Sequence, residues 1–118
     1  SDAEVARLVE AAFASYAHYW VESFRLPGTS LEDLDRGTVT IGYEHVEDAL
    51  ALGKGVVMAL PHLGAWEWIA FWLTTVKGHP VTAVAEQIEP PALAEWFVGL
   101  RNAFGMDIVP YGPQAASA

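Results

Sequence analysis

Residues 60–68 read Leu60-Pro61-His62-Leu63-Gly64-Ala65-Trp66-Glu67-Trp68. They follow an apolar run, residues 55–60, whose composition is typical of a buried strand, and they open an apolar segment, 66–76, that predicts a helix. His62 is therefore expected at the carboxyl end of a strand, with Glu67 in the first turn of the following helix. Ligands of open α/β sheets bind at that edge of the sheet.

The other expected elements also alternate between helix and strand. Ser1 and Glu4 have the form of a capping box, and apolar residues then recur with a helical period, which predicts an amphipathic helix over residues 2–26. Further helices are expected over 30–35, 44–52 and 92–104, and further strands over 38–41, 81–85 and from 108. This order predicts an α/β fold, a mostly parallel sheet covered by helices.

The strands are few for such a sheet, and the last begins close to residue 118. We therefore expect residues 1–118 to form a single partial domain, an incomplete part of a larger one. Within it, the sheet and the His62–Glu67 region would occupy residues 38–110, and residues 112–118 would form a mobile tail.

Composition excludes several classes of function. Net charge is −9, from 15 acidic and 6 basic residues, so the basic surface that nucleic acid or anionic lipid requires is missing. Cysteine is absent, which excludes disulfides and thiolate nucleophiles. Hydrophobic residues make up 53% of the chain, which provides material for a core and leaves apolar surface to meet another surface.

His62 and Glu67 suit general-base catalysis. A histidine accepts the proton of an attacking hydroxyl, and a nearby carboxylate orients the imidazole and stabilises its charged form. A structural interpretation stays open on spacing alone: His62 packs at a helix start, and Glu67 is an ordinary acid of a first helical turn.

Four other residues are candidates for substrate binding. Glu86 follows the strand predicted over 81–85, and Arg101 lies on the last helix, where it could reach a phosphate or carboxylate. The alternative for both is an ion pair, formed with each other or with other groups. Trp66 and Trp68 belong to a helix that is apolar on nearly every face, which fits core packing, a groove for an acyl chain, or both.

Other active-site motifs are missing from the sequence. His18, His45 and His79 lack zinc-ligand spacing, so we expect no metal. The sequence has no phosphate loop, no dinucleotide fingerprint and no nucleophile elbow.

Several blocks together resemble the bacterial lipid A late acyltransferase superfamily. Residues 42–67 end in a form of that family's H-x4-D/E signature, His62 to Glu67, and residues 101–110 resemble its R-x-x-x-G block. Residues 16–26 and 84–87 are most similar to the actinobacterial phosphatidylinositol mannoside acyltransferases.

The resemblance implies an α/β enzyme that moves a long-chain acyl group from acyl-CoA to a mannose hydroxyl of a phosphatidylinositol mannoside. His62 would be the general base and Glu67 the motif acid. Acyl-CoA would be a co-substrate, with no cofactor. The enzyme would lie peripherally on the cytoplasmic face of the plasma membrane. Members of the family are longer, so the chain would be an amino-terminal-half fragment that is inactive without the remaining polypeptide.

A second class of function also fits the residues: a non-catalytic module that binds lipid or a partner chain through its apolar helix faces. The helix over residues 2–26 could dock on a membrane or simply cover the sheet. Acyl-CoA binding that is independent of His62, without acyl transfer, would distinguish this module from an enzyme.

Overall fold

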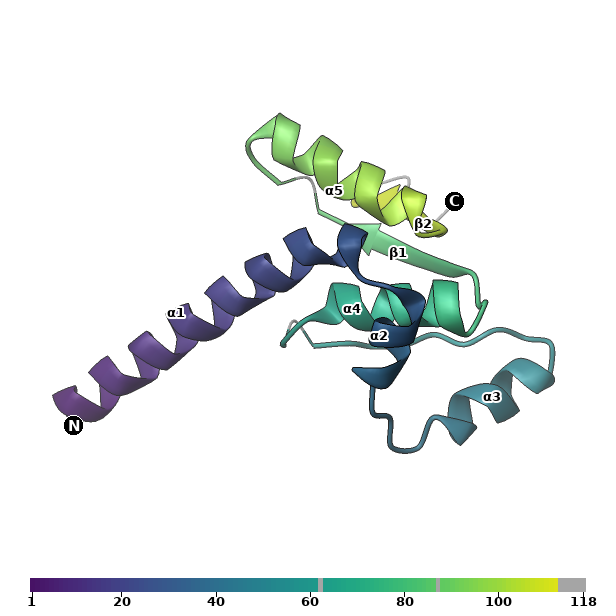
Figure 1. Cartoon of the computed structure of the whole chain (residues 1–118), viewed down its shortest axis with the longest axis horizontal. Coiled ribbons are helices and arrows are strands. Elements are labelled where there is room, and N and C mark those ends of the chain that lie inside the picture. The colour runs from purple at the N-terminus through teal and green to yellow at the C-terminus, as the bar shows by residue number, and fades with distance from the viewer. Residues whose placement is uncertain (62, 87, 113–118) are drawn as a thin grey trace.

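The computed structural model describes residues 1–61, 63–86 and 88–112. Most of this part of the chain is helical, with a small sheet at one side (Figure 1). In chain order the elements are α1 (Asp2–Arg25), the 3₁₀-helix η1 (Leu26–Gly28), α2 (Leu31–Arg36), α3 (Glu44–Ala51), α4 (Trp66–Phe71), the π-helix η2 (Trp72–Val76), β1 (Val81–Ala85), α5 (Pro91–Ala103) and β2 (Met106–Pro110).

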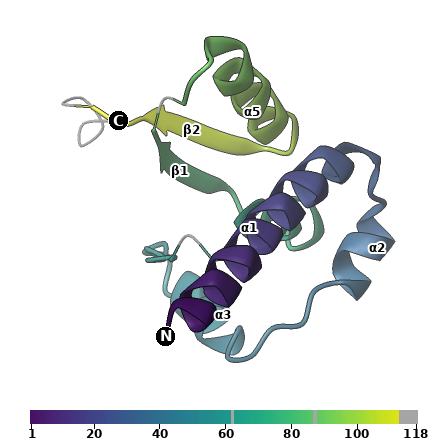
Figure 2. The ribbon, with the colours of Figure 1, turned by 90° about the vertical axis from the view of Figure 1, so that its left-hand side faces the viewer.

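The sheet confirms the predicted α/β class on a small scale. Strands β1 and β2 pair in parallel, with a register that runs from Val81 opposite Met106 to Ala85 opposite Pro110. Helix α5 connects them, as a parallel pair requires. Figure 2 shows α5 beside the two strands, at the other end of the molecule from α3.

Two predicted strands are wrong. Residues 38–41 and 55–60 carry no strand pairing in the described structure, and Ile41 and Val57 are each 99% exposed. A β-branched or apolar run forms a strand only where a neighbour supplies the hydrogen-bond ladder and a packed face. In the described part of the chain, the sheet contains only β1 and β2, and they pair with each other.

The core lies between α4, η2, α5, β2 and the segment around α2. Phe71 is fully buried and stacks on Phe104, with ring centres 4.1 Å apart. Leu26, Leu34 and Met106 close the cluster, each 2% exposed. The helix predicted over 66–76 therefore supplies the core as expected. It changes from α to π geometry after Phe71.

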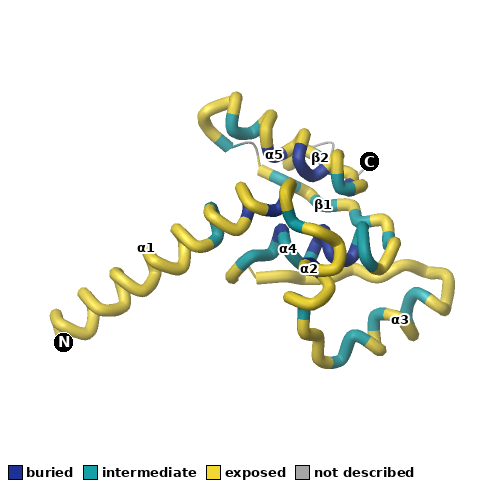
Figure 3. The backbone as a smooth tube through the Cα atoms, in the orientation of Figure 1, coloured by how far each residue is buried: buried dark blue, intermediate teal, exposed yellow. Residues whose placement is uncertain are grey.

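Helix α1 begins as predicted, with both hydrogen bonds of the Ser1–Glu4 capping box present. Residues 2–18 are exposed, and Figures 1 and 3 show this part of α1 reaching out from the body. The expectation that the helix covers the sheet is therefore wrong for most of its length. Its last turns pack on α5: Trp20 lies on Phe97, and Phe24 lies on Trp96.

The packing at Gly37, in the turn after α2, predicts that a larger residue there destabilises the fold. A Cβ atom on Gly37 would lie 2.8 Å from Cζ2 of Trp68 and 3.1 Å from the backbone oxygen of Asp33. Gly37→Ala should therefore displace the indole and lower the free energy of unfolding by about 1–3 kcal/mol. Urea denaturation would measure it.

Gly99→Ala is the matched control. Gly99 lies inside α5, and a Cβ atom there meets nothing within 4 Å. Because alanine favours the helix by about 0.5–1 kcal/mol, this variant should be more stable than the parent. Equal stability of the two variants would contradict the packing described at Gly37.

Candidate active site

The predicted motif ends in the first turn of α4. His62 lies outside the described residues. Gly64 has φ +64°, a conformation that L side chains rarely adopt, and Ala65 caps the helix without a side-chain hydrogen bond. Glu67 follows in the first turn of α4 as predicted, where a carboxylate is favoured by the helix dipole.

Glu67 is completely buried and forms an ion pair with Arg101 of α5. Arg101 Nη2 donates to Glu67 Oε1 at 2.6 Å, and Arg101 Nε lies 3.2 Å from Oε1 and 3.4 Å from Oε2. Arg101 is itself only 9% exposed. Charge-assisted bonds of this kind compensate part of the cost of removing both ions from water.

Two aromatic rings lie against the guanidinium group of Arg101. Its Cζ atom is 4.7 Å from the ring centre of Trp66 and 5.1 Å from that of Phe97. An arginine cation is attracted to the face of an aromatic ring, and more strongly away from water. Arg101 is thus held by Glu67 and two rings, so the salt bridge and the core packing form one unit.

Tyr19 of α1 is a third partner of the carboxylate. Its Oη donates to Glu67 Oε1 at 3.4 Å. Burial raises the pKa of Tyr19 above its ordinary value, and the negative charge of Glu67 raises it further. The phenol therefore stays protonated and remains a donor. Three helices, α1, α4 and α5, meet at this one carboxylate.

The sequence is similar to those of known bacterial proteins over most of its length. The sequence model of the bacterial lipid A biosynthesis acyltransferase family matches residues 1–114. The chain belongs to this family. It is 41% identical over 103 residues to a phosphatidylinositol mannoside acyltransferase of Mycolicibacterium smegmatis. It is 39% identical over 105 residues to a Mycobacterium tuberculosis protein of the same name. Each match covers 87% of this chain, which spans about a third of the length of these relatives (34% and 33%).

The structure of this acyltransferase-family chain brings together three of the predicted site residues: Glu67, Arg101 and Trp66. Arg101 does form an ion pair, but with Glu67, and among the described residues no ion pair involves Glu86. No local pattern marked Tyr19 as their neighbour: it lies 48 positions from Glu67. The available signals were its place near the end of an aromatic-rich helix and within the block 16–26 that resembles the family, and neither indicated its partner.

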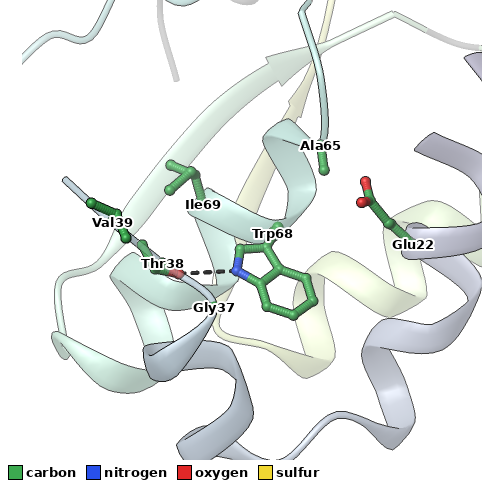
Figure 4. Close-up of a pocket in the computed structure, with 7 residues that line it drawn as sticks. All are labelled: Glu22, Gly37, Thr38, Val39, Ala65, Trp68 and Ile69. Atoms are coloured by element: carbon green, nitrogen blue, oxygen red, sulfur yellow. Dashed lines mark hydrogen bonds between the residues drawn. The ribbon is translucent and has the colours of Figure 1, made fainter. Parts of the chain in front are cut away.

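Trp68 lies apart from the ion pair, beside a groove between α1, α4 and the turn after α2 (Figure 4). Its Nε1 donates to Thr38 Oγ1 at 2.9 Å. The groove has a volume of about 420 Å³ and is lined by Glu22, Gly37, Thr38, Val39, Ala65, Trp68 and Ile69. Figure 4 shows the Glu22 carboxylate at one side of it and the indole between Glu22 and Thr38.

Glu86 faces a second groove, of about 390 Å³, between α1 and the loop that follows β1. The other lining residues are Tyr16, Trp20, Ile88, Glu89 and Leu93. Substrate binding by Glu86, Arg101, Trp66 and Trp68 stays a prediction. Arg101 and Trp66 lie together at the ion pair, whereas Trp68 and Glu86 line two separate grooves.

No three His, Cys, Asp or Glu side chains of the described part of the chain gather where they could hold a metal ion. In the same part, no helix has the length and apolar character needed to cross a membrane.

The buried pair predicts a non-additive effect on stability. Arg101→Leu would leave the Glu67 carboxylate buried and unpaired, so it should lower the free energy of unfolding by about 3–5 kcal/mol. The double variant Glu67→Leu/Arg101→Leu removes both charges and should cost less than Arg101→Leu alone. Urea denaturation of Arg101→Leu, Glu67→Leu and the double variant measures the difference.

Arg36→Leu is the matched control for an exposed pair. Arg36 is paired with Glu32 and Asp33 on α2, and its side chain is 68% exposed. Its loss should change stability by at most about 1 kcal/mol. Strictly additive single and double variants at 67 and 101 would argue against a direct pair.

Proposed function

We propose that this chain is the part of a longer acyltransferase that carries the general base and positions it. The reaction is transfer of a long-chain acyl group from acyl-CoA to a mannose hydroxyl of a phosphatidylinositol mannoside. Membership of the acyltransferase family supports the reaction class, and the names of the two mycobacterial relatives support the acceptor. The remaining polypeptide completes the domain, and the chain alone is inactive.

His62 is the general base in this proposal. It takes the proton of the mannose hydroxyl as the oxygen attacks the thioester carbonyl carbon. The tetrahedral intermediate then collapses: the carbon–sulfur bond breaks, the new ester remains on the sugar, and the CoA thiolate receives the proton from the imidazolium. No other bond is formed or broken.

Glu67 acts as a positioning residue. The observation that carries this part of the proposal is the burial of Glu67 against Arg101: the carboxylate is 0% exposed and both of its oxygens already accept hydrogen bonds. It holds the first turn of α4, which follows His62 in the sequence. A carboxylate that partners the imidazole is then supplied by the remaining polypeptide.

Association with the membrane is peripheral and apolar, on the cytoplasmic face. Exposed apolar side chains on α1 support it: Val5, Leu8 and Phe13 are 59%, 60% and 71% exposed. The chain carries a net charge of −9, so hydrophobic contact rather than attraction to anionic lipid provides the binding.

The test is acyl transfer by the full-length protein with His62→Ala. Loss of a general base should lower turnover by roughly two to four orders of magnitude without a change in the melting temperature. His45→Ala is the control, since His45 is an exposed histidine on α3. Turnover by His62→Ala that equals that of the control would refute the mechanism. Acyl-CoA binding by an inactive parent would instead favour a non-catalytic lipid-binding module.

A further inference from the structure

Helix α1 reaches the buried ion pair through Tyr19. We propose that Tyr19 is a positioning residue for the acyl transfer: its hydroxyl holds the Glu67–Arg101 pair in place and so fixes the start of α4. This inference rests on the proposed function. It assigns to α1 a role in the reaction that is separate from any contact with a membrane.

The Tyr19 hydroxyl donates to the oxygen of the pair that accepts the most hydrogen bonds. Glu67 Oε1 accepts Arg101 Nη2 at 2.6 Å, Arg101 Nε at 3.2 Å and Tyr19 Oη at 3.4 Å. Arg101 approaches from α5 and Tyr19 from α1. A carboxylate held by donors on two other helices has little freedom to rotate. A single donor would restrict it less.

Tyr19 is itself held firmly. Its ring lies edge-on to Trp20, with centres 5.7 Å apart, and is stacked with Tyr16 at 6.4 Å. Ser23, which is 1% exposed, donates to the backbone oxygen of Tyr19 at 2.8 Å. Trp20 in turn lies edge-on to Phe97 of α5 at 5.6 Å. The end of α1 is therefore packed on the same helix that supplies Arg101.

The consequence for the reaction follows from the position of Glu67. Glu67 is five residues after His62 and lies in the first turn of α4. In the proposed function, the start of α4 is what positions the base. Tyr19 does not contact the reacting groups in this account. Its loss should therefore lower kcat and leave the KM for acyl-CoA unchanged, because the substrate binds as before but meets a less well placed base.

The experiment compares Tyr19→Phe with Tyr111→Phe in the full-length protein. Both variants lose a phenol hydroxyl, but Tyr111 is 78% exposed. We expect Tyr19→Phe to lower kcat about tenfold, the low end for loss of a hydrogen bond to a charged group, with KM changed by less than about twofold. A kcat for Tyr19→Phe equal to that of Tyr111→Phe would overturn the inference.

A double-mutant cycle separates positioning from a general effect on the fold. In a Glu67→Gln background, Tyr19→Phe should lower the single-turnover rate much less than it does in the parent, because the partner of the hydroxyl has already changed. High enzyme concentration keeps this slow background measurable. An equal effect in both backgrounds would show that Tyr19 acts elsewhere, which contradicts the inference.

His62→Ala completes the set of variants and separates the two proposals. If His62→Ala is inactive while Tyr19→Phe matches Tyr111→Phe, the role of Tyr19 is wrong and the proposed function stands. If His62→Ala retains parental turnover, both proposals fail.

Discussion

The described structure depends on one buried ion pair, Glu67 with Arg101. Glu67 lies in the first turn of α4 and Arg101 in the last turn of α5, so each charge also meets the favourable end of its own helix dipole. Two charges removed from water are stable together only when every remaining donor and acceptor is matched. The pair is surrounded by the aromatic faces of Trp66 and Phe97 and by the hydroxyl of Tyr19. These contacts connect α1, α4 and α5.

In our proposal the two residues of the short motif have different roles, one in the chemical step and one in positioning. The residue that performs the proton transfer in our proposal, His62, precedes the helix, whereas the acid of the motif faces away from solvent into a closed network. An acid that is already bound on both oxygens is poorly suited to receive a proton from substrate, but well suited to fix a backbone turn. Positioning of this kind contributes to the rate, because a small displacement of a general base removes much of the rate enhancement that it provides.

The sequence predicted local structure well and long-range structure poorly. The capping box of Ser1 and Glu4, the helices and the two strands of the sheet follow from local periodicity and turn residues, which act within a few positions. The last strand was expected from 108 and begins at Met106. The strands predicted over 38–41 and 55–60 failed because strand formation depends on a partner that local sequence does not specify. For the site, proximity in sequence gave Trp66 and Glu67, and the position of Arg101 on the last predicted helix marked it as a candidate, but neither showed that Arg101 pairs with Glu67. The contact of Tyr19 depends on how α1 packs across 48 positions, which no motif encodes.

The most direct test of the central claim is the rate at which the Arg101 Nε proton exchanges with water, measured by NMR and assigned with Arg101→Lys. A buried, bonded guanidinium predicts a resolved signal at neutral pH that exchanges far more slowly than that of the exposed Arg36, and that speeds up in Glu67→Gln. An Arg101 signal that exchanges as fast as that of Arg36, or that does not respond to Glu67→Gln, would contradict the account.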